Sequence, residues 1–344
     1  MDIKFNSSEN FTGEALTDRL SIFDDVFTAN GGSSYTSPLA NTLKGIRILG
    51  PGVQMTPIAD NVIGLFFVTR PVLNLEDDNV VKSPRFAPFY KAQTDSLPAY
   101  VRGLLDYRSA NLYPHPDLDN KLAWIAPLTN LCKASNGFPD LDLEVRKSNP
   151  GIRNEVHQAP VGILDENGPL TINTTFYNPK PGIIPYIFQT WESYIPEVRL
   201  GDNEMEPSLE ALAGNYWDFD CRIYHFIMNK NLRNIESMYM TVQSIPVTYP
   251  MGAMSAIDNE STVRRGQGQD ELTIQFSSVG ARFDTFEVVD GFNGATVFFN
   301  PNMGDDQRSS YYRQIQPSEF LEKQYNVYPW INLSTMELEW WTAK

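Results

Sequence analysis

Residues that bind metals or form cross-links are scarce in this chain. Only two of its 344 residues are cysteine and three are histidine. Cys132 and Cys221 belong to no CxxC pattern, so we expect no disulfide framework and a reducing compartment. His115, His157 and His225 form no HExxH pair, and no segment has the oxygen spacing of a calcium loop. The sequence therefore predicts no metal ion and no other cofactor.

Long apolar runs are missing as well. No stretch reaches the roughly 18 uninterrupted apolar residues that a membrane-spanning helix needs. Residues 1–16 lack the basic segment and apolar core that are typical of a secretory leader. We therefore expect no membrane span, no membrane partner and no secretion.

Positive charge is in deficit. The chain has 27 lysines and arginines against 42 acidic residues, which gives a net charge of −15 and a pI near 4.6. Because nucleic-acid phosphates require a basic footprint, this balance argues against a general nucleic-acid-binding surface. The pair Arg264–Arg265 precedes Gly266 and Gly268, but the stretch lacks the GK[ST] ending of a phosphate-binding loop. A solvated loop is the better interpretation.

Abundant acidic residues raise the alternative of a carbohydrate-binding or glycoside-cleaving protein. Such cleavage needs two carboxylates about 5–10 Å apart on the walls of a groove. Nothing in the sequence pairs any two acids, and alternating acids on a strand usually form a solvated face. Neutralising Asp220 or Glu204 would test the enzyme hypothesis. The acidic clusters are Glu76–Asp78, Asp140/Asp142/Glu144, Glu204/Glu206, Asp218/Asp220 and Asp305–Asp306.

Other catalytic signatures are also missing. The GxSxG motif of serine hydrolases does not occur. Cys221 and His225 lie within an expected strand, where a small buried thiol and a half-buried imidazole are the simpler interpretations. The sequence therefore predicts no catalytic, cofactor-binding or metal-binding residue, and we expect a protein that is not an enzyme.

Aromatic and turn-forming residues are plentiful, with 20 Phe, 16 Tyr, 6 Trp, 24 Pro and 22 Gly. This composition favours a β-rich fold with long connections. Period-two alternation predicts strands at 221–229 and 271–278, and a half-buried strand at 140–147. Residues 61–69 indicate a buried strand that Pro71 ends, since proline cannot donate to a central ladder.

The remaining segments are less regular. Residues 231–247 indicate a helix-like turn, and a polar glycine-containing excursion follows it up to the strand at 271–278. Residues 85–131 favour short helices divided by prolines, and residues 282–301 favour one or two more strands. The predicted fold class is α+β and β-rich, with a helical insertion and extended terminal arms.

The pattern divides the chain into four parts. Residues 1–60 form an N-terminal arm with a candidate helix at 13–27, and residues 61–170 form a strand followed by a helix-rich insertion. Residues 171–300 form the main β domain, and residues 301–344 form a C-terminal extension.

Aromatic residues crowd the end of this extension. They either fold back onto the core or are covered by a partner, because a terminal aromatic cluster left in water is a liability. We expect an adjacent subunit to order at least one terminus. The cluster consists of Tyr328, Trp330, Trp340 and Trp341.

Residues 172–300 resemble the tail-tube proteins of tailed bacteriophages, and residues 64–75 resemble virion structural proteins of large phages. The resemblance rests on residue-type patterns and covers a little over a third of the chain. The patterns are Tyr177–Pro179, the segment 188–198, the strand at 221–229, Arg233–Glu236, Ile245–Val247, the strand at 271–278 and Phe292–Asn293.

The resemblance implies a tail-tube-like β-sandwich or partial barrel whose strands join those of neighbouring copies in a hexameric ring. Residues 238–270 would then correspond to the excursion between rings or subunits. Other tail or baseplate proteins would be partners, and DNA would pass through an acidic lumen only as cargo. The additions at 76–170 and 301–344 favour a baseplate or tube-junction part of a virion that assembles in the host cytoplasm. A capsid or neck structural protein remains a further alternative.

Overall fold

The computed structural model describes residues 63–108, 114–140, 143–164, 168–180, 182–207, 217–228, 233–255, 270–315, 319 and 327–344. The candidate helix at 13–27 and the basic stretch at 264–268 lie outside these residues. None of the described helices is long and apolar enough to cross a bilayer.

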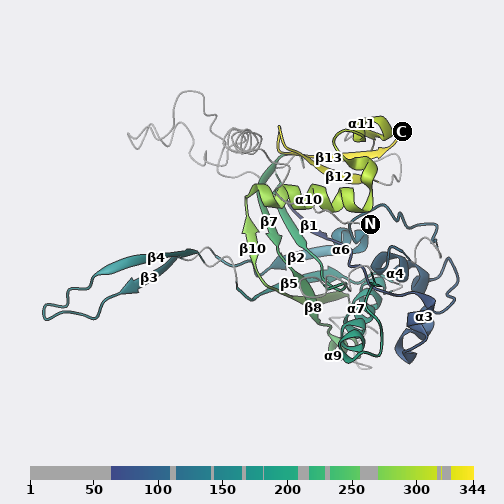
Figure 1. The fold of residues 1–344 in the computed structure, drawn as a ribbon, viewed down its shortest axis with the longest axis horizontal. Coiled ribbons are helices and arrows are strands. Elements are labelled where there is room, and N and C mark those ends of the chain that lie inside the picture. The colour runs from purple at the N-terminus through teal and green to yellow at the C-terminus, as the bar shows by residue number, and fades with distance from the viewer. Residues whose placement is uncertain are drawn as a thin grey trace, which may run out of the picture.

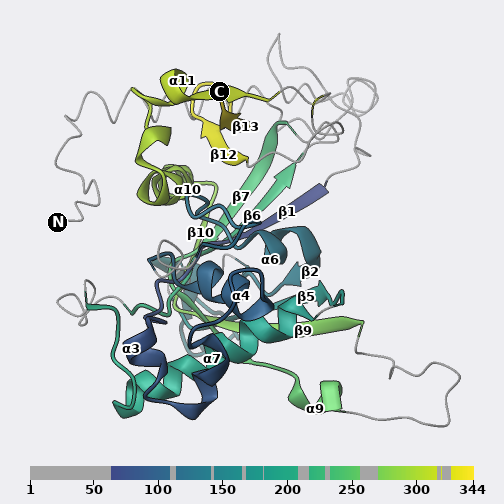
Figure 2. The same ribbon diagram turned by 90° about the vertical axis from the view of Figure 1, so that its right-hand side faces the viewer.

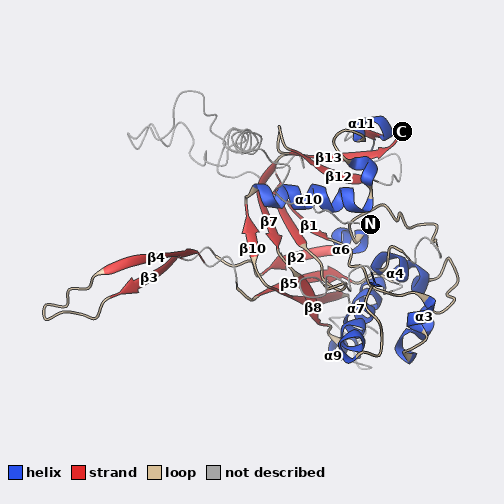
Figure 3. Ribbon diagram, viewed as in Figure 1, coloured by secondary structure: helices blue, strands red, loops and turns tan. Residues whose placement is uncertain are grey.

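Two four-stranded antiparallel sheets form the body of the molecule (Figures 1 and 3). The central sheet has the order β1-β6-β7-β10, with β1 at Ile63–Val68, β6 at Ile223–Met228, β7 at Ile235–Thr241 and β10 at Ala281–Phe283. The outer sheet has the order β2-β5-β9-β8, with β2 at Cys132–Asn136, β5 at Leu170–Tyr177, β9 at Glu271–Ser278 and β8 at Ser244–Thr248.

Two smaller β units complete the described strands. The C-terminal sheet has the order β11-β13-β12, with β11 at Tyr312–Gln314, β13 at Glu337–Ala343 and β12 at Tyr328–Asn332. Strands β3 (Leu143–Lys147) and β4 (Gln158–Leu164) pair only with each other and form a hairpin, here called the arm. In Figure 1 the arm projects far from the body.

Helices cover the sheets. The described helices are α3 (Asp77–Val80), η1 (Pro84–Phe89), α4 (Leu97–Leu105), α6 (Ala126–Leu131), α7 (Ile183–Leu200), α9 (Met251–Ser255), α10 (Phe286–Phe299), η2 (Pro301–Met303) and α11 (Arg308–Tyr311). The Ser96 hydroxyl caps α4 by accepting a bond from the Ala99 amide at 3.3 Å. Helix α7 ends at Gly201, whose φ of +84° is the left-handed conformation that glycine adopts readily.

A bent ribbon joins the two large sheets at one corner. Strand β7 runs almost directly into β8, and β9 into β10, while β7 pairs with β10 and β8 with β9. At the bend, the Val242 amide donates to the Gly280 carbonyl at 3.0 Å, and the Val279 amide donates to the Gln243 carbonyl at 3.2 Å. The described strands form no closed barrel. The prediction of a β-rich α+β fold is confirmed.

The central sheet is buried on both faces. Phe66, Val68 and Ile223 on one face belong to a core that includes β5, β9, α4 and α7. Tyr224 and Phe226 on the other face lie under α10 and the C-terminal sheet, which Figure 2 shows stacked above the central sheet. The burial of both faces means that this sheet shows no clear alternation of apolar and polar residues.

Phe292 of α10 lies at the centre of the second core. Its ring stacks on Trp124 with a centroid distance of 4.3 Å, and it meets Phe226 at 5.0 Å and Phe67 at 5.2 Å in edge-on contacts. Tyr224 completes the cluster at 5.4 Å. Offset and edge-on aromatic pairs add to the stabilisation that burial alone provides.

The outer sheet is buried on one face only. Leu272, Ile274 and Phe276 of β9 are buried, and Phe276 contacts Phe188 of α7 with ring centroids 5.7 Å apart. Thr273 and Gln275, which alternate with them, are exposed. The predicted strands at 271–278 and 221–229 are confirmed, as is the strand within 61–69 and the short helices within 85–131.

Two predictions of local structure are wrong. The described part of 231–247 lies mainly in strands β7 and β8 and forms no helix-like turn. Strands β6 and β9 lie in different sheets. Residues 286–299 form α10 and not strands. Their aromatic and β-branched composition favours strands, but Val288, Val289, Phe292 and Thr296 are buried at helical spacing, so packing overrides propensity.

The strand at 140–147 is only partly as predicted. Strand β3 begins at Leu143, and every one of its residues is exposed, so the expectation of half-burial is wrong. The alternation of Leu143 and Val145 with charged residues resembles an amphipathic strand, although no part of the described chain covers the apolar side.

The Phe292 cluster yields a stability prediction. Phe292→Ala removes a fully buried ring from between α10 and the central sheet, and we expect a loss of about 3–5 kcal/mol in the free energy of unfolding. Urea denaturation followed by circular dichroism measures it. Phe298→Ala on the same helix is the matched control, because Phe298 is 39% exposed and should cost about 1 kcal/mol or less. Equal losses for the two variants would contradict this view of the core.

Candidate functional site

Six of the acids in the predicted acidic clusters have partners within the described chain. Glu204 forms an ion pair with Lys82 at 2.7 Å on the surface. Asp220 accepts hydrogen bonds from the Gln243 side chain and, at 3.3 Å, from the Trp217 amide. Asp77 pairs with Arg102, Asp305 with Arg308 and Glu206 with Arg108. Asp142 lies outside the described residues.

Asp218 lies in a buried polar network between α7 and the α3 segment. One of its carboxylate oxygens accepts bonds from the Tyr194 hydroxyl and, at 3.2 Å, from the Glu206 amide. The other oxygen is buried with no hydrogen-bond partner. Burial raises the pKa of Asp218 to about 6, and it also raises the pKa of Asp220 to about 6. These carboxyls connect parts of the core.

The histidines and cysteines show no catalytic arrangement in the described part of the chain. His225 is half-buried in β6 against the ring of Phe138, and burial lowers its pKa. The buried Cys221 thiol donates to the Ser244 carbonyl at 3.3 Å, and burial raises the pKa of Cys132 to about 11. Across the described residues, no three His, Cys, Asp or Glu side chains are placed to hold a metal ion.

The two edges of the outer sheet differ. Strand β2 pairs with β5 on one side, and no described strand pairs with its other side. All five residues of β2 are half-exposed or exposed. At the opposite edge, the backbone of Ser244 in β8 already bonds that of Cys221, and Pro246 has no amide hydrogen to offer. The β2 edge is therefore the open one.

The arm begins at a well-anchored point. Gly137 follows β2 with a φ of +110°, and an added Cβ atom would lie 2.1 Å from the Thr171 carbonyl oxygen, so only glycine fits there. The next residue, Phe138, contacts the ring of Tyr239 at 5.5 Å on the central sheet. The sequence predicted a strand at 140–147 but no partner strand for it, so this hairpin was not anticipated.

The tip of the arm is exposed and apolar. Ile152 is fully exposed, and Val156 is 48% exposed. The turn is closed by bonds from the Gly151 amide to the Glu155 carbonyl at 2.9 Å and from the Asn154 amide to the Gly151 carbonyl at 3.0 Å. Single exposed aliphatic residues are common on protein surfaces, so the meaning of Ile152 depends on what could cover it.

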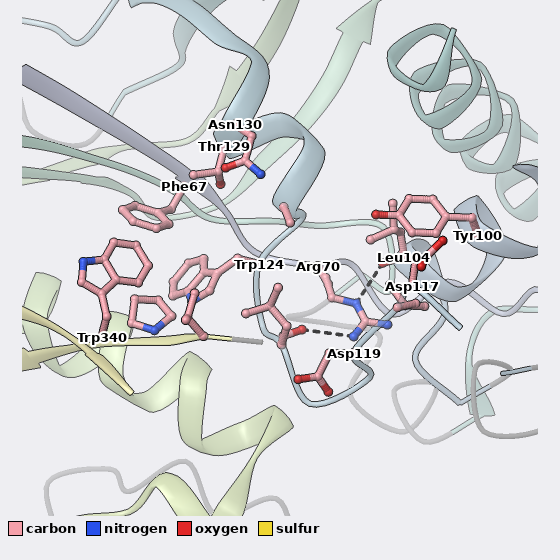
Figure 4. Close-up of a pocket in the computed structure, with 15 residues that line it drawn as sticks. Phe67, Arg70, Tyr100, Leu104, Asp117, Asp119, Trp124, Thr129, Asn130 and Trp340 are labelled. Atoms are coloured by element: carbon pink, nitrogen blue, oxygen red, sulfur yellow. Dashed lines mark hydrogen bonds between the residues drawn. The ribbon is translucent and has the colours of Figure 1, made fainter. Parts of the chain in front are cut away.

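A cavity of about 240 Å³ lies between β1, α4, α6 and the C-terminal sheet (Figure 4). Its wall is largely aromatic and aliphatic, with two acids, neither of which belongs to an acidic cluster of the sequence analysis. The side chains that line it include Phe67, Arg70, Tyr100, Asp117, Leu118, Asp119, Trp124, Thr129, Val327 and Trp340.

Arg70 fixes one wall of the cavity. Its buried guanidinium donates to the carbonyls of Leu104 at 2.9 Å, Leu122 at 3.1 Å and Asn120 at 3.1 Å, and to that of Gly103. Burial lowers the pKa of Arg70 to about 10, so it stays protonated at neutral pH. One cation thus ties the end of α4 to the loop before α6.

Polar atoms in the cavity wall are incompletely bonded. The indole N–H of Trp124 and the hydroxyl of Thr129 are buried and have no hydrogen-bond partner. Asp119 accepts a bond from the Tyr328 hydroxyl, whereas Asp117 is exposed at the rim beside Tyr100. Buried donors of this kind normally find an acceptor.

The aromatic C-terminal residues fold back onto their own chain. Strand β13 lies in the middle of the C-terminal sheet, and Tyr328 and Trp330 on β12 are 5% exposed each. Trp340 packs against the second core. Of the two alternatives left open by the sequence, folding back is the one observed for this terminus. Residues 1–62, which form the other terminus, lie outside the described part.

Asp218 yields a pH prediction. Its pKa in the folded state is above its value in the unfolded chain, so folding is stabilised when the pH falls through about 6 and loses that stabilisation as the pH rises. Asp218→Asn keeps an acceptor for Tyr194 but removes the charge. Between pH 7.5 and 5.5 the wild type should gain about 1 kcal/mol more in the free energy of unfolding than the variant does.

Urea denaturation at a series of pH values measures this difference. Asp202→Asn, which changes an exposed carboxyl, is the matched control and should keep the pH slope of the wild type. If the free energy of unfolding of the Asp218→Asn variant depends on pH as steeply as that of the wild type, the assignment of this pH dependence to Asp218 is refuted.

The chain matches one protein family along residues 1–344, described as "Putative phage tail tube protein". A search of curated proteins finds no similar sequence. Among solved structures, the chain is similar to the tube-terminating cap of the anti-feeding prophage, with 11% identity, coverage of 44% of this chain and 78% of that one, and a TM-score of 0.27. It is also similar to the extended sheath–tube complex of the PVC extracellular contractile injection system, with 10% identity, 44% and 79% coverage, and a TM-score of 0.25. The chain belongs to this family of phage tail tube proteins, an assignment that rests on the whole-chain match.

Proposed function

We propose that this chain is a non-catalytic structural subunit that self-associates into a ring, six-fold as the resemblance implies, in a phage tail. The single observation that favours it is the open β2 edge of the outer sheet. An unpaired edge offers a row of N–H and C=O groups that invites another strand. Pairing with an edge of an identical copy would satisfy these groups and repeat around a ring.

The exposed face of the outer sheet suits a channel lining. Its exposed side chains are mainly hydroxyl and amide groups, and the ion pair between Lys133 and Glu271 at 2.5 Å balances the charges at the end of β5. Such a face has no basic footprint for phosphates, and the net charge of −15 repels them. We infer that DNA would pass such a ring as cargo without binding.

The segments outside the tube-like β unit bear on where this chain lies in the particle. We infer that a tube-like β unit at 171–300 is surrounded by the helix-rich segment within 61–170 and by the extension at 301–344. Residues 1–60 would form an N-terminal arm, separate from the hairpin arm. Such additions favour a specialised part at the baseplate or tube junction, bounded by other tail proteins. The particle is a virion, and assembly takes place in the host cytoplasm. A capsid or neck position is the structural alternative.

The carbohydrate-active alternative has less support. The cavity does combine aromatic residues with Asp117 and Asp119, but Asp119 is already bonded to Tyr328. About 240 Å³ is also small beside the roughly 300–1,000 Å³ of ordinary ligand pockets. Neutralising Asp117 in an assay on glycan substrates separates this alternative from the structural one.

The β2 edge yields an assembly prediction. Ala134→Lys adds a second positive charge beside Lys133 on the open edge, which should block pairing with a neighbour and abolish most rings. The free energy of unfolding should change by about 0.5 kcal/mol or less, because the site is exposed. Negative-stain images and sedimentation velocity of the purified chain measure assembly.

Thr171→Lys is the matched control. It adds the same charge to the same exposed face but on β5, which is paired on both sides, so its rings should persist. Intact rings in the Ala134→Lys variant would exclude this edge as the contact, and a wild type that stays monomeric at high concentration would refute the proposed function.

A further inference from the structure

We propose that the tip of the arm of one subunit docks into the cavity of a neighbouring copy, with Ile152 inside the cavity and Arg153 against Asp117 at its rim. This contact rests on the proposed self-assembly, because the cavity's occupant is a second copy of the chain.

The tip is shaped before it binds. Its turn is closed by the two backbone bonds within residues 151–155, and the Arg153 amide donates to the Glu155 carboxylate at 2.7 Å. Asn154 has a φ of +59°, a left-handed conformation that asparagine tolerates. Ile152 protrudes from this turn and is fully exposed. An ordered tip loses little conformational entropy on docking, which favours affinity.

The cavity offers complementary chemistry. Phe67, Trp124 and Trp340 supply an apolar wall of a size that suits one branched aliphatic side chain and a short length of backbone. Insertion would remove an exposed isoleucine from water and bury it against these rings.

The charges also match. The arm, residues 143–164, has three basic and two acidic residues in a chain whose net charge is −15. At the cavity, Arg70 is already engaged by carbonyls and lies in the field of Asp106 and Asp119. Asp117 remains exposed at the rim and is the acid that an incoming Arg153 would meet. Opposite charges at a rim steer association and fix its register.

The contact has a direction that suits a ring. In Figure 1 the arm points away from the body on one side, while α4, α6 and the C-terminal sheet, which surround the cavity, lie on the other. Figure 2 presents this second side to the viewer. Because tip and cavity lie on opposite sides, the contact is head-to-tail. Head-to-tail contacts produce rings when the rotation closes.

A charge-reversal cycle on the full chain tests the proposal. Ile152→Asp should raise the concentration at which half the chain is assembled by about tenfold or more, as expected for one lost aliphatic anchor. Arg153→Glu and Asp117→Arg should each raise it by about threefold or more, and the double variant should return to within about twofold of the wild type. Sedimentation velocity across a concentration series measures these midpoints.

Two variants on the arm itself serve as matched controls. Arg146→Glu makes the same charge reversal on β3 away from the tip, and Val161→Asp places an acid on β4 where the side chain is 42% exposed. Both should assemble within about twofold of the wild type. Thermal unfolding of every variant at a concentration below assembly verifies that the monomers are equally folded.

A cross-link locates the contact directly. In a Cys132→Ser background, chains with Ile152→Cys are mixed with chains with Leu118→Cys, which places the second thiol in the cavity wall. Mild oxidation should give a disulfide-linked dimer. Replacing Leu118→Cys by Leu200→Cys, at the exposed end of α7, should give none.

The outcomes separate this inference from the proposed function. Wild-type assembly that is unaffected by Ile152→Asp, or a double variant without recovery, overturns the tip-in-cavity contact while the ring proposal stands. Linkage through Leu200→Cys in place of Leu118→Cys overturns it as well. A wild type that never assembles overturns both.

Discussion

The corner where β7 passes into β8 and β9 into β10 is the constraint on which both large sheets depend. Three buried hydroxyl residues meet there: Ser244 donates to Thr241 at 2.7 Å and lies 2.5 Å from the Ser278 hydroxyl. Cys221 and Ser244 exchange backbone bonds at 2.9 and 2.8 Å. Small side chains that bond one another let the backbones approach without leaving buried polar groups unpaired. The bend therefore fixes the angle at which the outer sheet presents its open edge.

The second core and the cavity share residues, which links stability to recognition. Phe67 and Trp124 pack against Phe292 on one side and line the cavity on the other. Arg70 holds the facing wall through carbonyls from two separate segments. Core packing thus shapes one wall of the cavity, and Arg70 holds the loop before α6 that supplies the other. Walls held in this way keep their form before a partner arrives, so little of the binding free energy is lost to ordering.

The strand at 271–278 was predicted because it alternates, with Leu272 and Phe276 facing α7 while Thr273 faces solvent. Strands β1 and β6 of the central sheet were also predicted correctly. Strand β7 was missed because a register shift near its start interrupts the alternation, and Ile235 and Met238 are buried three positions apart, a spacing that also suits a helix. The half-burial predicted for 140–147 was wrong for a different reason, because alternation of apolar and polar residues cannot reveal that both faces of a strand are exposed. The cavity combines segments around residues 67, 117 and 340, and a single sequence gives no measure of which distant residues meet.

The strong negative charge limits how such a subunit can associate with its own copies. Bodies of net charge −15 repel one another, but salt screens that repulsion beyond roughly 8–10 Å. Contacts must therefore be short-ranged, apolar or locally of opposite sign. The open β2 edge with Lys133 and the arm with its basic residues both satisfy this condition. The net charge therefore discourages general aggregation and favours contacts whose local chemistry overcomes the repulsion.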